Sequence, residues 1–383
     1  MSVEIYIDWQ GVTNLVGSLH SADRSAAVSF EYSAEWLARS DAFAIEPTSL
    51  PLRPGPHHAP VLFGAMRDCG PDRWGRVLIE RAVRKQVLER CPYHELGYVV
   101  ALQDTARIGA LRFRANADGP FLAATAGKLP SLVHVAALLR ATQAIHNETE
   151  TAEDLHVLLG AGALLGGARP KATVLLNDGR LATAKFPKPK DVRDITAGEV
   201  LALALGRRAG ISVADHQLVT VGKKNLSVIT RFDRDGPHRI PFISASTLLG
   251  LPADNPGAYT TLADGIQRFG ADIPKELSEL WRRMVFSLLA SNYDDHLRNH
   301  GFLMHTPGRW VLSPAYDLNP VPEVDRARSP KTPITEESDE LSIEAALAAA
   351  PRFGLKPPTA KGNVGECSPR NPGLAGDGTE TPD

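Results

Sequence analysis

The segments NYDDHLRN, at residues 292–299, and SPAYD, at residues 313–317, decide the fold and the chemistry of this chain. They place a carboxylate at Asp294, an amide at Asn299 and a second carboxylate at Asp317. Phosphoryl transfer needs such a set, because one acid orients the attacking hydroxyl while an Asn and an Asp hold magnesium ions against the phosphates. The same residue types also occur in ordinary loops, where their side chains satisfy local backbone groups. A structural interpretation therefore stands beside the catalytic one.

Apolar segments bracket this cluster on both sides. The run at residues 280–289 predicts a buried helix that leads into it, and residues 301–304 and 310–312 predict two strands after it. The candidate metal ligands would then lie at the ends of rigid elements, where side chains can be held in place. Polar side chains between buried elements also need partners, which favours the catalytic interpretation.

A stretch rich in small residues lies upstream, at residues 160–173. Small residues let the backbone approach phosphate oxygens, although Gly/Ala runs also serve tight helix packing. The spacing matches neither a Walker A loop nor a dinucleotide-binding fingerprint. Two alternating segments follow, at residues 173–176 and 181–184, joined by a turn at residues 177–179 and ending at Lys185. In kinase sites, a glycine-rich loop that covers the phosphates, a hairpin and a phosphate-pairing lysine follow one another along the chain in this order.

The next segments extend the same pattern. Residues 197–208 predict a helix with Glu199 near its start, and Glu199 is the candidate counter-charge for Lys185. A glutamate in the first turn of a helix is also favourable to the helix dipole alone. A predicted strand at residues 226–230 then leads into residues 231–236, where we expect the hinge between two lobes.

Together these blocks resemble the HipA family, serine/threonine protein kinases that act as toxins in bacterial toxin–antitoxin pairs. The resemblance extends over most of the chain, from about residue 1 to about residue 350. It rests on the order of five blocks, at residues 166–171 (GGARPK), 184–187 (AKFP), 231–236 (RFDRDG), 294–299 (DDHLRN) and 312–320 (LSPAYDLNP). A further block, DCGPDRWGR at residues 68–76, is similar to a motif of the family's N-terminal subdomain.

The resemblance implies a role for each matching residue. Asp294 matches the catalytic aspartate, and Asn299 and Asp317 match the ligands of Mg²⁺. Lys185 matches the lysine that pairs with the phosphates. The other residues expected around ATP are those of the nucleotide-binding loop (Gly166, Gly167, Ala168, Arg169, Pro170 and Lys171), of the hinge (Thr230, Arg231 and Phe232), and His296 and Tyr316.

The expected fold class is α+β. We expect a bilobal protein-kinase-like fold with a strand-rich N-terminal subdomain at residues 1–130 and an all-α C-terminal lobe at residues 236–355. Residues 131–235 would form the nucleotide-binding part of the N-terminal lobe. Residues 356–383 are rich in Pro, Gly and Thr and carry almost no large apolar side chain, which predicts a disordered tail. The C-terminal lobe would then lack one or two closing helices, or the chain is a family member whose tail has merely diverged.

The function implied by the resemblance is that of a toxin with protein kinase activity. Its substrates would be proteins of the translation apparatus, aminoacyl-tRNA synthetases among them, and its partner a helix-turn-helix antitoxin. DNA would be reached only through that antitoxin. Two other interpretations stay open: a catalytically impaired binding module or co-repressor that acts with the antitoxin, and a kinase of small molecules.

One residue departs from the family pattern. Family members that inactivate themselves by autophosphorylation carry a serine two residues before the Gly-Gly pair, and this chain has Leu164 there. Leucine has no hydroxyl to accept a phosphoryl group. We therefore predict no self-inactivation by that route.

Composition restricts the remaining possibilities. A 43% apolar and 22% charged content is that of a soluble globular protein, and a net charge of −2 gives no general attraction to nucleic acid. Three scattered cysteines do not suggest a disulfide framework or a zinc site. No apolar run is long enough to cross a membrane, and the first residues do not resemble a signal peptide. The expected location is the cytoplasm, without a membrane partner.

Overall fold

A five-stranded antiparallel sheet opens the chain in the computed structural model, which describes residues 2–22, 25–89, 91–92, 94–123, 129–162, 169–252, 255–322 and 330–367. Alternating apolar residues build it, because every second side chain of a strand points to the same face. Val3, Ile5 and Ile7 are buried in the first strand, and Val28 and Phe30 in the third. In spatial order the strands are β4 (His57–Ala59), β3 (Val28–Tyr32), β2 (Val12–Ser21), β1 (Ser2–Trp9) and β5 (Leu111–Arg114).

Short helices connect the strands of this N-terminal subdomain. They are α1 (Ala34–Leu37), α2 (Gly64–Asp68), α3 (Arg73–Arg84), α4 (Glu95–Ala101) and the 3₁₀ turn η1 (Asp104–Ala106). The break between α2 and α3 falls at Gly70 and Pro71. Asp72 then begins α3 as its N-cap, and its Oδ1 accepts a hydrogen bond from the Gly75 N–H at 2.8 Å.

The middle of the chain forms a four-stranded antiparallel sheet with helices around it. The predicted hairpin is confirmed as β6 (Lys171–Leu175) and β7 (Leu181–Lys185), and Gly179 takes the positive φ of +84° that its turn requires. The sheet order is β6-β7-β9-β8, with β9 (Lys224–Thr230) and β8 (His216–Val221). The surrounding helices are η2 (Leu132–His134), α5 (Val135–Asn147), α6 (Ala152–Gly160) and α7 (Ile195–Arg208).

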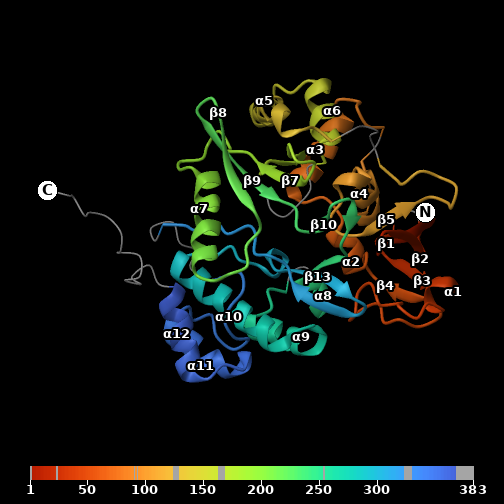
Figure 1. Cartoon of the computed structure of the whole chain (residues 1–383). Helices are drawn as coiled ribbons and strands as arrows, with labels where there is room; N and C mark the ends of the chain where they lie inside the picture. The colour runs from red at the N-terminus through yellow and green to blue at the C-terminus, as the bar shows by residue number, and fades with distance from the viewer. Residues whose placement is uncertain are drawn as a thin grey trace.

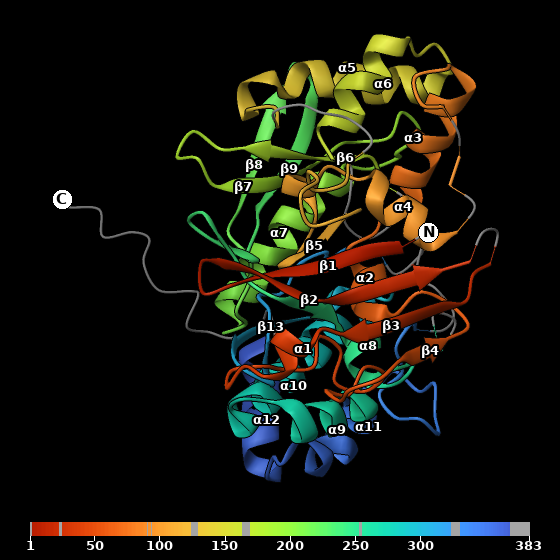
Figure 2. The ribbon, with the colours of Figure 1, turned by 90° about the vertical axis from the view of Figure 1, so that its right-hand side faces the viewer.

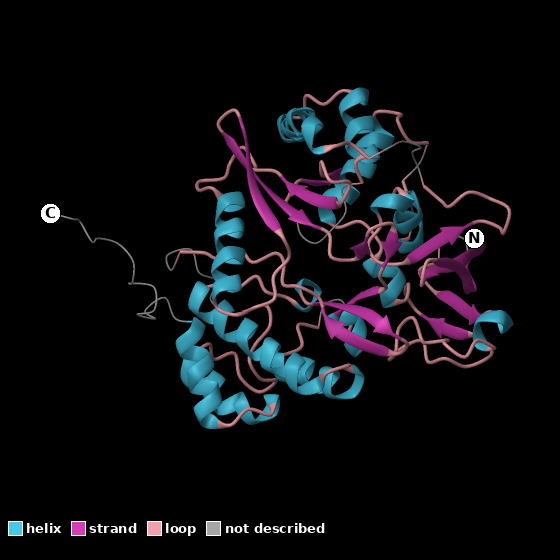
Figure 3. Ribbon diagram, in the orientation of Figure 1, coloured by secondary structure: helices cyan, strands magenta, loops and turns pink. Residues whose placement is uncertain are grey.

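The C-terminal lobe, expected to be all-α, is mainly helical but also includes a three-stranded sheet (Figure 3). The strands expected after the catalytic segment are confirmed as β13 (Gly301–Thr306) and β14 (Arg309–Leu312), whereas β12 (Phe242–Ser244) was not anticipated. A small ribbon of β10 (Arg234–Asp235) and β11 (His238–Arg239) precedes the lobe. Its helical elements are α8 (Ala245–Leu249), α9 (Tyr259–Phe269), α10 (Ile273–Ala290), η3 (Leu297–Asn299), α11 (Ile343–Ala349), η5 (Ala350–Phe353) and α12 (Pro357–Cys367).

The predicted disordered tail is wrong for its first part. Residues 357–367 form α12, which packs against α10 (Figure 1). The prediction counted large apolar residues, but α12 buries the small side chains of Ala360 and Cys367 instead. The Arg282 guanidinium adds an ion pair to Glu366 at 3.3 Å. The C-terminal lobe therefore has closing helices, and residues 368–383 lie outside the described residues.

The N-terminal subdomain contacts both of the other parts, and Figure 2 shows its sheet in front of the region where they meet. Toward the middle sheet, Lys171 Nζ forms an ion pair with Asp72 Oδ2 at 2.7 Å. Toward the C-terminal lobe, the Asp68 carboxylate accepts hydrogen bonds from Ser244 N at 2.7 Å and Ser244 Oγ at 2.9 Å. The turn between α2 and α3 is thereby bound to the middle sheet and to the C-terminal lobe.

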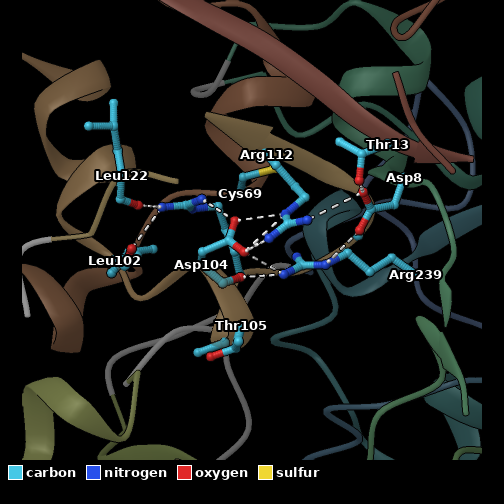
Figure 4. A network of polar contacts seen from close by, with 12 residues as sticks. Asp8, Thr13, Cys69, Leu102, Asp104, Thr105, Arg112, Leu122 and Arg239 are labelled. Atoms are coloured by element: carbon cyan, nitrogen blue, oxygen red, sulfur yellow. Dashed lines mark hydrogen bonds and ion pairs between the residues drawn. The ribbon is translucent and has the colours of Figure 1, made fainter. Parts of the chain in front are cut away.

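A partly buried network of arginines and aspartates joins the subdomain to the β10–β11 ribbon (Figure 4). Asp104 accepts hydrogen bonds from Arg112 at 2.7 Å and from Arg239 at 2.9 Å. Asp8 lies 3.3 Å from Arg239 and 3.5 Å from Arg112. Burial by itself would raise the pKa of Asp104, but Arg239 and then Arg112 lower it, so its carboxylate stays charged.

Candidate active site

A cavity of about 500 Å³ lies where the three parts of the chain meet. The middle sheet contributes Thr183 and Lys185 to its lining, and the C-terminal lobe contributes His296, Tyr316 and Asp317. The N-terminal subdomain closes a further side with residues of the turn between α2 and α3. Such a size is that of a small-molecule site.

Lys185 lies at the centre of the charged groups of this cavity. Its ammonium group donates to Glu199 Oε1 and, at 2.7 Å, to Asp317 Oδ1. Glu199 is held in turn by Ser227, whose hydroxyl donates to Oε2 at 2.7 Å. Burial would lower the pKa of Lys185, but Asp317 and Glu199 raise it, so the side chain stays protonated. The predicted pairing of Glu199 with Lys185 is confirmed.

Asp317 has an unusual backbone conformation. Its φ is +57°, in the left-handed region that side chains other than glycine seldom occupy. Such conformations cluster at functional sites, where the surrounding structure holds them. Asn319 Nδ2 donates to Asp317 Oδ1 at 2.9 Å. Burial would raise the pKa of Asp317, but Lys185 and then Lys171 lower it, so a carboxylate faces the cavity.

The loop after α10 carries the other two residues of the predicted catalytic set. Asp294 is exposed and Asn299 is buried, and neither is among the residues that line the cavity. Asn299 Nδ2 donates to the Asp294 carbonyl at 3.3 Å, and its Oδ1 is buried without a hydrogen-bond partner in the described parts of the chain. An unpaired buried oxygen costs free energy unless a further ligand satisfies it.

Two contacts bring Asn299 and Asp317 to the same side of the C-terminal lobe. At the base of the β13–β14 hairpin, Ser313 N donates to the Gly301 carbonyl at 2.8 Å. The Tyr316 hydroxyl then donates to the Arg298 carbonyl at 2.9 Å. The loop before the hairpin and the loop after it are thus fastened together.

An apolar side of the cavity lies next to the hinge. The rings of Phe232 and Tyr316 have centroids 5.3 Å apart, and those of Phe232 and Phe242 are 6.2 Å apart. Ile108 of the N-terminal subdomain and Ile229 of β9 also line this side. A flat aromatic group such as a purine could stack here.

Several residues expected around the nucleotide have other roles. The Arg231 guanidinium donates to the Ala106 carbonyl at 2.6 Å and pairs with Asp233, so Arg231 joins the hinge to the N-terminal subdomain. Lys171 is fully buried and paired with Asp72, and Arg169 pairs with Asp191 at 2.6 Å. Neither Lys171, Arg169 nor Pro170 lines the cavity, whereas the three hinge residues Thr230, Arg231 and Phe232 do. Gly166, Gly167, Ala168 and Leu164 lie outside the described residues.

The sequence did not predict that the N-terminal subdomain would contribute residues to the cavity. Arg67, Asp68, Asp72 and Arg73 line the cavity. Burial raises the pKa of Asp68, which accepts hydrogen bonds from Ser244, the N-cap residue of α8. The sequence block at residues 68–76 is visible in the chain, but nothing in it indicates that it faces the site.

Two sequence models of one protein family match the chain. The HipA N-terminal domain matches residues 9–114, and the HipA-like C-terminal domain matches residues 163–370, more than half of the chain. This chain belongs to the HipA family. The second match includes Lys185, Asp294, Asn299 and Asp317, whereas the cavity residues of the N-terminal subdomain lie within the first match.

Individual relatives agree with this assignment. A protein named "Putative kinase" from Haemophilus influenzae is 24% identical over 188 residues, which are 43% of this chain and 55% of the relative. The chain thus matches about half the length of that curated relative. HipA of Shewanella oneidensis MR-1, solved with HipB and operator DNA, superposes with a TM-score of 0.67 at 18% identity, over 97% of this chain and 89% of that one.

A third relative adds little. The Helicobacter pylori proinflammatory kinase CtkA is 17% identical over 54% of this chain and 83% of that one, with a TM-score of only 0.40.

Within the described part of this HipA-family chain, no helix has the length and apolar character needed to cross a membrane.

The oxygen atoms of this HipA-family site suit a hard cation. The unpaired Asn299 Oδ1 and the Asp317 carboxylate are the amide and carboxylate ligands that Mg²⁺ accepts. Among the described residues there is no cluster of three or more His, Cys, Asp or Glu side chains that could hold a metal. Two protein ligands fit Mg²⁺, which usually takes few carboxylates and completes its shell with water and substrate phosphates.

Proposed function

We propose that this protein is an ATP- and magnesium-dependent serine/threonine protein kinase that acts as the toxin of a toxin–antitoxin pair. The observation that carries the proposal is the position of Lys185, held between Glu199 and Asp317 in a cavity of nucleotide size. Protein kinases hold their phosphate-pairing lysine with a helix glutamate and place a metal-binding aspartate beside it.

Each residue of the site has a part in the proposed reaction. The adenine would stack beside Phe232 and Tyr316, and Lys185 would neutralise phosphate charge. Asn299 and Asp317 would hold magnesium, which screens the phosphate oxygens when bound. Asp294 orients the acceptor hydroxyl and takes its proton while that oxygen bonds to the γ-phosphorus and the bond from this phosphorus to the β,γ-bridging oxygen breaks. Most of the rate enhancement would come from positioning and charge stabilisation.

The partners and the location belong to the same proposal. Substrates would be translation proteins, aminoacyl-tRNA synthetases among them, phosphorylated in the cytoplasm with growth inhibition as the result. The Shewanella relative was solved with HipB and operator DNA, which supports a DNA-binding antitoxin as the partner here. The net charge of −2 favours contact with DNA through that antitoxin.

The rival interpretation is an impaired binding module or co-repressor. It drew its support from an incomplete C-terminal lobe, and α11 and α12 remove that support because both pack on α10. A kinase of small molecules would use the same residues, so experiment must separate it from a protein kinase.

In the deciding experiment, the purified protein is incubated with labelled ATP, magnesium and a host lysate. The variant Asp294→Ala, changed at an exposed position, is assayed in parallel as the control. A labelled protein band that is absent with the variant is expected. Labelled small molecules without a labelled band would indicate the small-molecule kinase. ATP binding without any transfer would refute the kinase proposal in favour of the binding module.

A further inference from the structure

We propose that Arg73, contributed by the N-terminal subdomain, contacts the terminal phosphate of the nucleotide. This inference rests on the proposed function and adds a phosphate-binding residue from outside the two kinase lobes. A guanidinium group suits this task because its planar fork of N–H donors can bind a phosphate through two hydrogen bonds at once.

The position of Arg73 follows from a short chain of contacts. Lys171 lies directly opposite Lys185 in the β6–β7 ladder, and Lys171 Nζ pairs with Asp72 Oδ2 at 2.7 Å. Arg73 is the next residue and begins α3. Asp72, Arg73, Lys185 and Asp317 all line the same cavity. Arg73 therefore lies at the end of the cavity where the phosphates would bind.

The backbone at Arg73 is held in place on both sides. Asp72 is fixed by Lys171 and caps α3 through Gly75. Trp74 is buried in the core of the N-terminal lobe, where its ring stacks on His146 with centroids 5.7 Å apart. A ligand contact by Arg73 would therefore cost only the ordering of one side chain.

Among the described residues, Arg73 has no polar partner. It is exposed, and within the described ranges its guanidinium forms no hydrogen bond or ion pair. In the described part of the chain, four carboxylates line the cavity, and each of them is engaged with a group other than Arg73. Asp68 accepts from Ser244, Asp72 pairs with Lys171, Asp233 with Arg231 and Asp317 with Lys185.

Lys188 lies close enough to Arg73 for the two positive charges to interact, and the neighbouring cations Arg169 and Lys171 are paired with Asp191 and Asp72. Burial lowers the pKa of Lys188, and Arg169, Arg73 and Lys171 lower it further, against the opposing effect of Asp191. Cations crowded in this way favour an anionic ligand with several charges, such as a triphosphate.

The terminal phosphate is the part of the nucleotide that this arrangement fits. Lys185 already stands between Glu199 and Asp317, which suits it to the inner phosphates. Arg73 comes from a different element and approaches from the side of the N-terminal subdomain. An arginine in such a position could stabilise charge on the phosphoryl group as it is transferred.

Nucleotide affinity tests the inference without relying on activity. Binding of ADP and of a non-hydrolysable ATP analogue would be measured by calorimetry, with magnesium, for the parent protein and for Arg73→Ala, Arg73→Lys and Arg84→Ala. Arg84 is the matched control, because it lies at the other end of α3, is exposed and does not line the cavity.

A selective loss is expected. Arg73→Ala should bind the ATP analogue about 10- to 100-fold more weakly, as for one charge-assisted hydrogen-bonded contact, and should bind ADP like the parent. Arg73→Lys should lose less, because it retains the charge, and Arg84→Ala should match the parent.

Each other result has its own meaning. If Arg73→Ala binds the ATP analogue as tightly as Arg84→Ala does, the inference is overturned while the proposed function stands. An equal loss for ADP and the ATP analogue would overturn the assignment to the terminal phosphate. If the parent binds neither nucleotide, the proposed function fails, and the inference fails with it.

Discussion

Lys185 and Asp317 are 132 positions apart in the chain, yet the lysine Nζ lies 2.7 Å from the aspartate Oδ1. The lysine ends a strand of the middle sheet, and the aspartate follows a hairpin of the C-terminal lobe. This ion pair crosses the cavity and connects the phosphate-pairing residue with the candidate metal ligand. Both groups are charged and held close together, and such preorganisation reduces the reorganisation that binding requires.

Glu199→Gln should slow phosphoryl transfer by about 10- to 100-fold, because Lys185 would keep only one carboxylate and lose its fixed position. Initial rates would be compared with those of Glu344→Gln, a control at an exposed glutamate of α11. Melting temperatures of both variants show whether the fold is retained. A folded Glu199→Gln variant with the parental rate would refute the role of this pairing.

Asn299→Ala should raise the magnesium concentration needed for half-maximal nucleotide binding by about tenfold, because it removes the unpaired Oδ1. Asn299→Asp should retain magnesium binding, since a carboxylate is also a hard oxygen ligand. The exposed Asn147 at the end of α5 provides the control Asn147→Ala. A magnesium dependence shared by Asn299→Ala and the control would exclude Asn299 as a ligand.

Asp233→Ala should lower the free energy of unfolding by about 3–5 kcal/mol, because it leaves Arg231 and Arg234 buried without their shared carboxylate. Asp235→Ala, two residues along and exposed, should stay within about 0.5 kcal/mol of the parent. Urea denaturation measures both changes. Equal values for the two variants would contradict the role assigned to this buried pair.

The effect of Asp233→Ala should also depend on pH. Burial would raise the pKa of Asp233, but Arg231 and Arg234 hold it well below its ordinary range. The carboxylate therefore stabilises the fold fully above about pH 4, and this stabilisation is lost as the pH falls further. The difference between parent and variant should shrink under acid conditions.

Glu46 should give the stability of the fold the opposite dependence on pH. Burial raises its pKa from 4.5 to about 7, although the Ala65 N–H donates to its Oε2 at 2.9 Å. The charged form is thus disfavoured in the folded state, and the parent should lose about 3 kcal/mol of stability as the pH rises from about 4.5 to 7. Glu46→Gln should be more stable than the parent at pH 8 and equal to it near pH 4. Thermal unfolding would be measured as a function of pH, with a change at an exposed glutamate, Glu35→Gln, as the control. A stability difference between the parent and Glu46→Gln that does not change with pH would contradict the raised pKa of Glu46.

Truncation tests the role of α12. Removing residues 357–383 should lower the free energy of unfolding by about 2 kcal/mol, because Ala360 and Cys367 leave the core. Removing residues 368–383 alone provides the control, because it leaves α12 in place. Equal melting temperatures for the two truncations would show that α12 contributes nothing to stability.

Local patterns in the sequence predicted much of the fold. The turn at residues 177–179 with alternating segments around it predicted the β6–β7 hairpin, and the apolar run at residues 280–289 predicted part of α10. Both follow from periodicity and turn chemistry, which act between neighbours in the chain. The carboxylate–amide–carboxylate order also depends only on spacing, so Asp294, Asn299 and Asp317 could be singled out directly.

Contacts between distant segments were decided by the tertiary structure alone. Nothing near Arg231 in the sequence indicates that its guanidinium would bind the Ala106 carbonyl, and nothing near Arg73 indicates that it would line the cavity. Likewise, the composition of α12 hides the fact that its small side chains fit against α10. The sequence by itself determined which residues have the right chemistry and which elements carry them. Packing decided which of those residues meet, because burial and ion pairing depend on neighbours that can lie more than a hundred positions away.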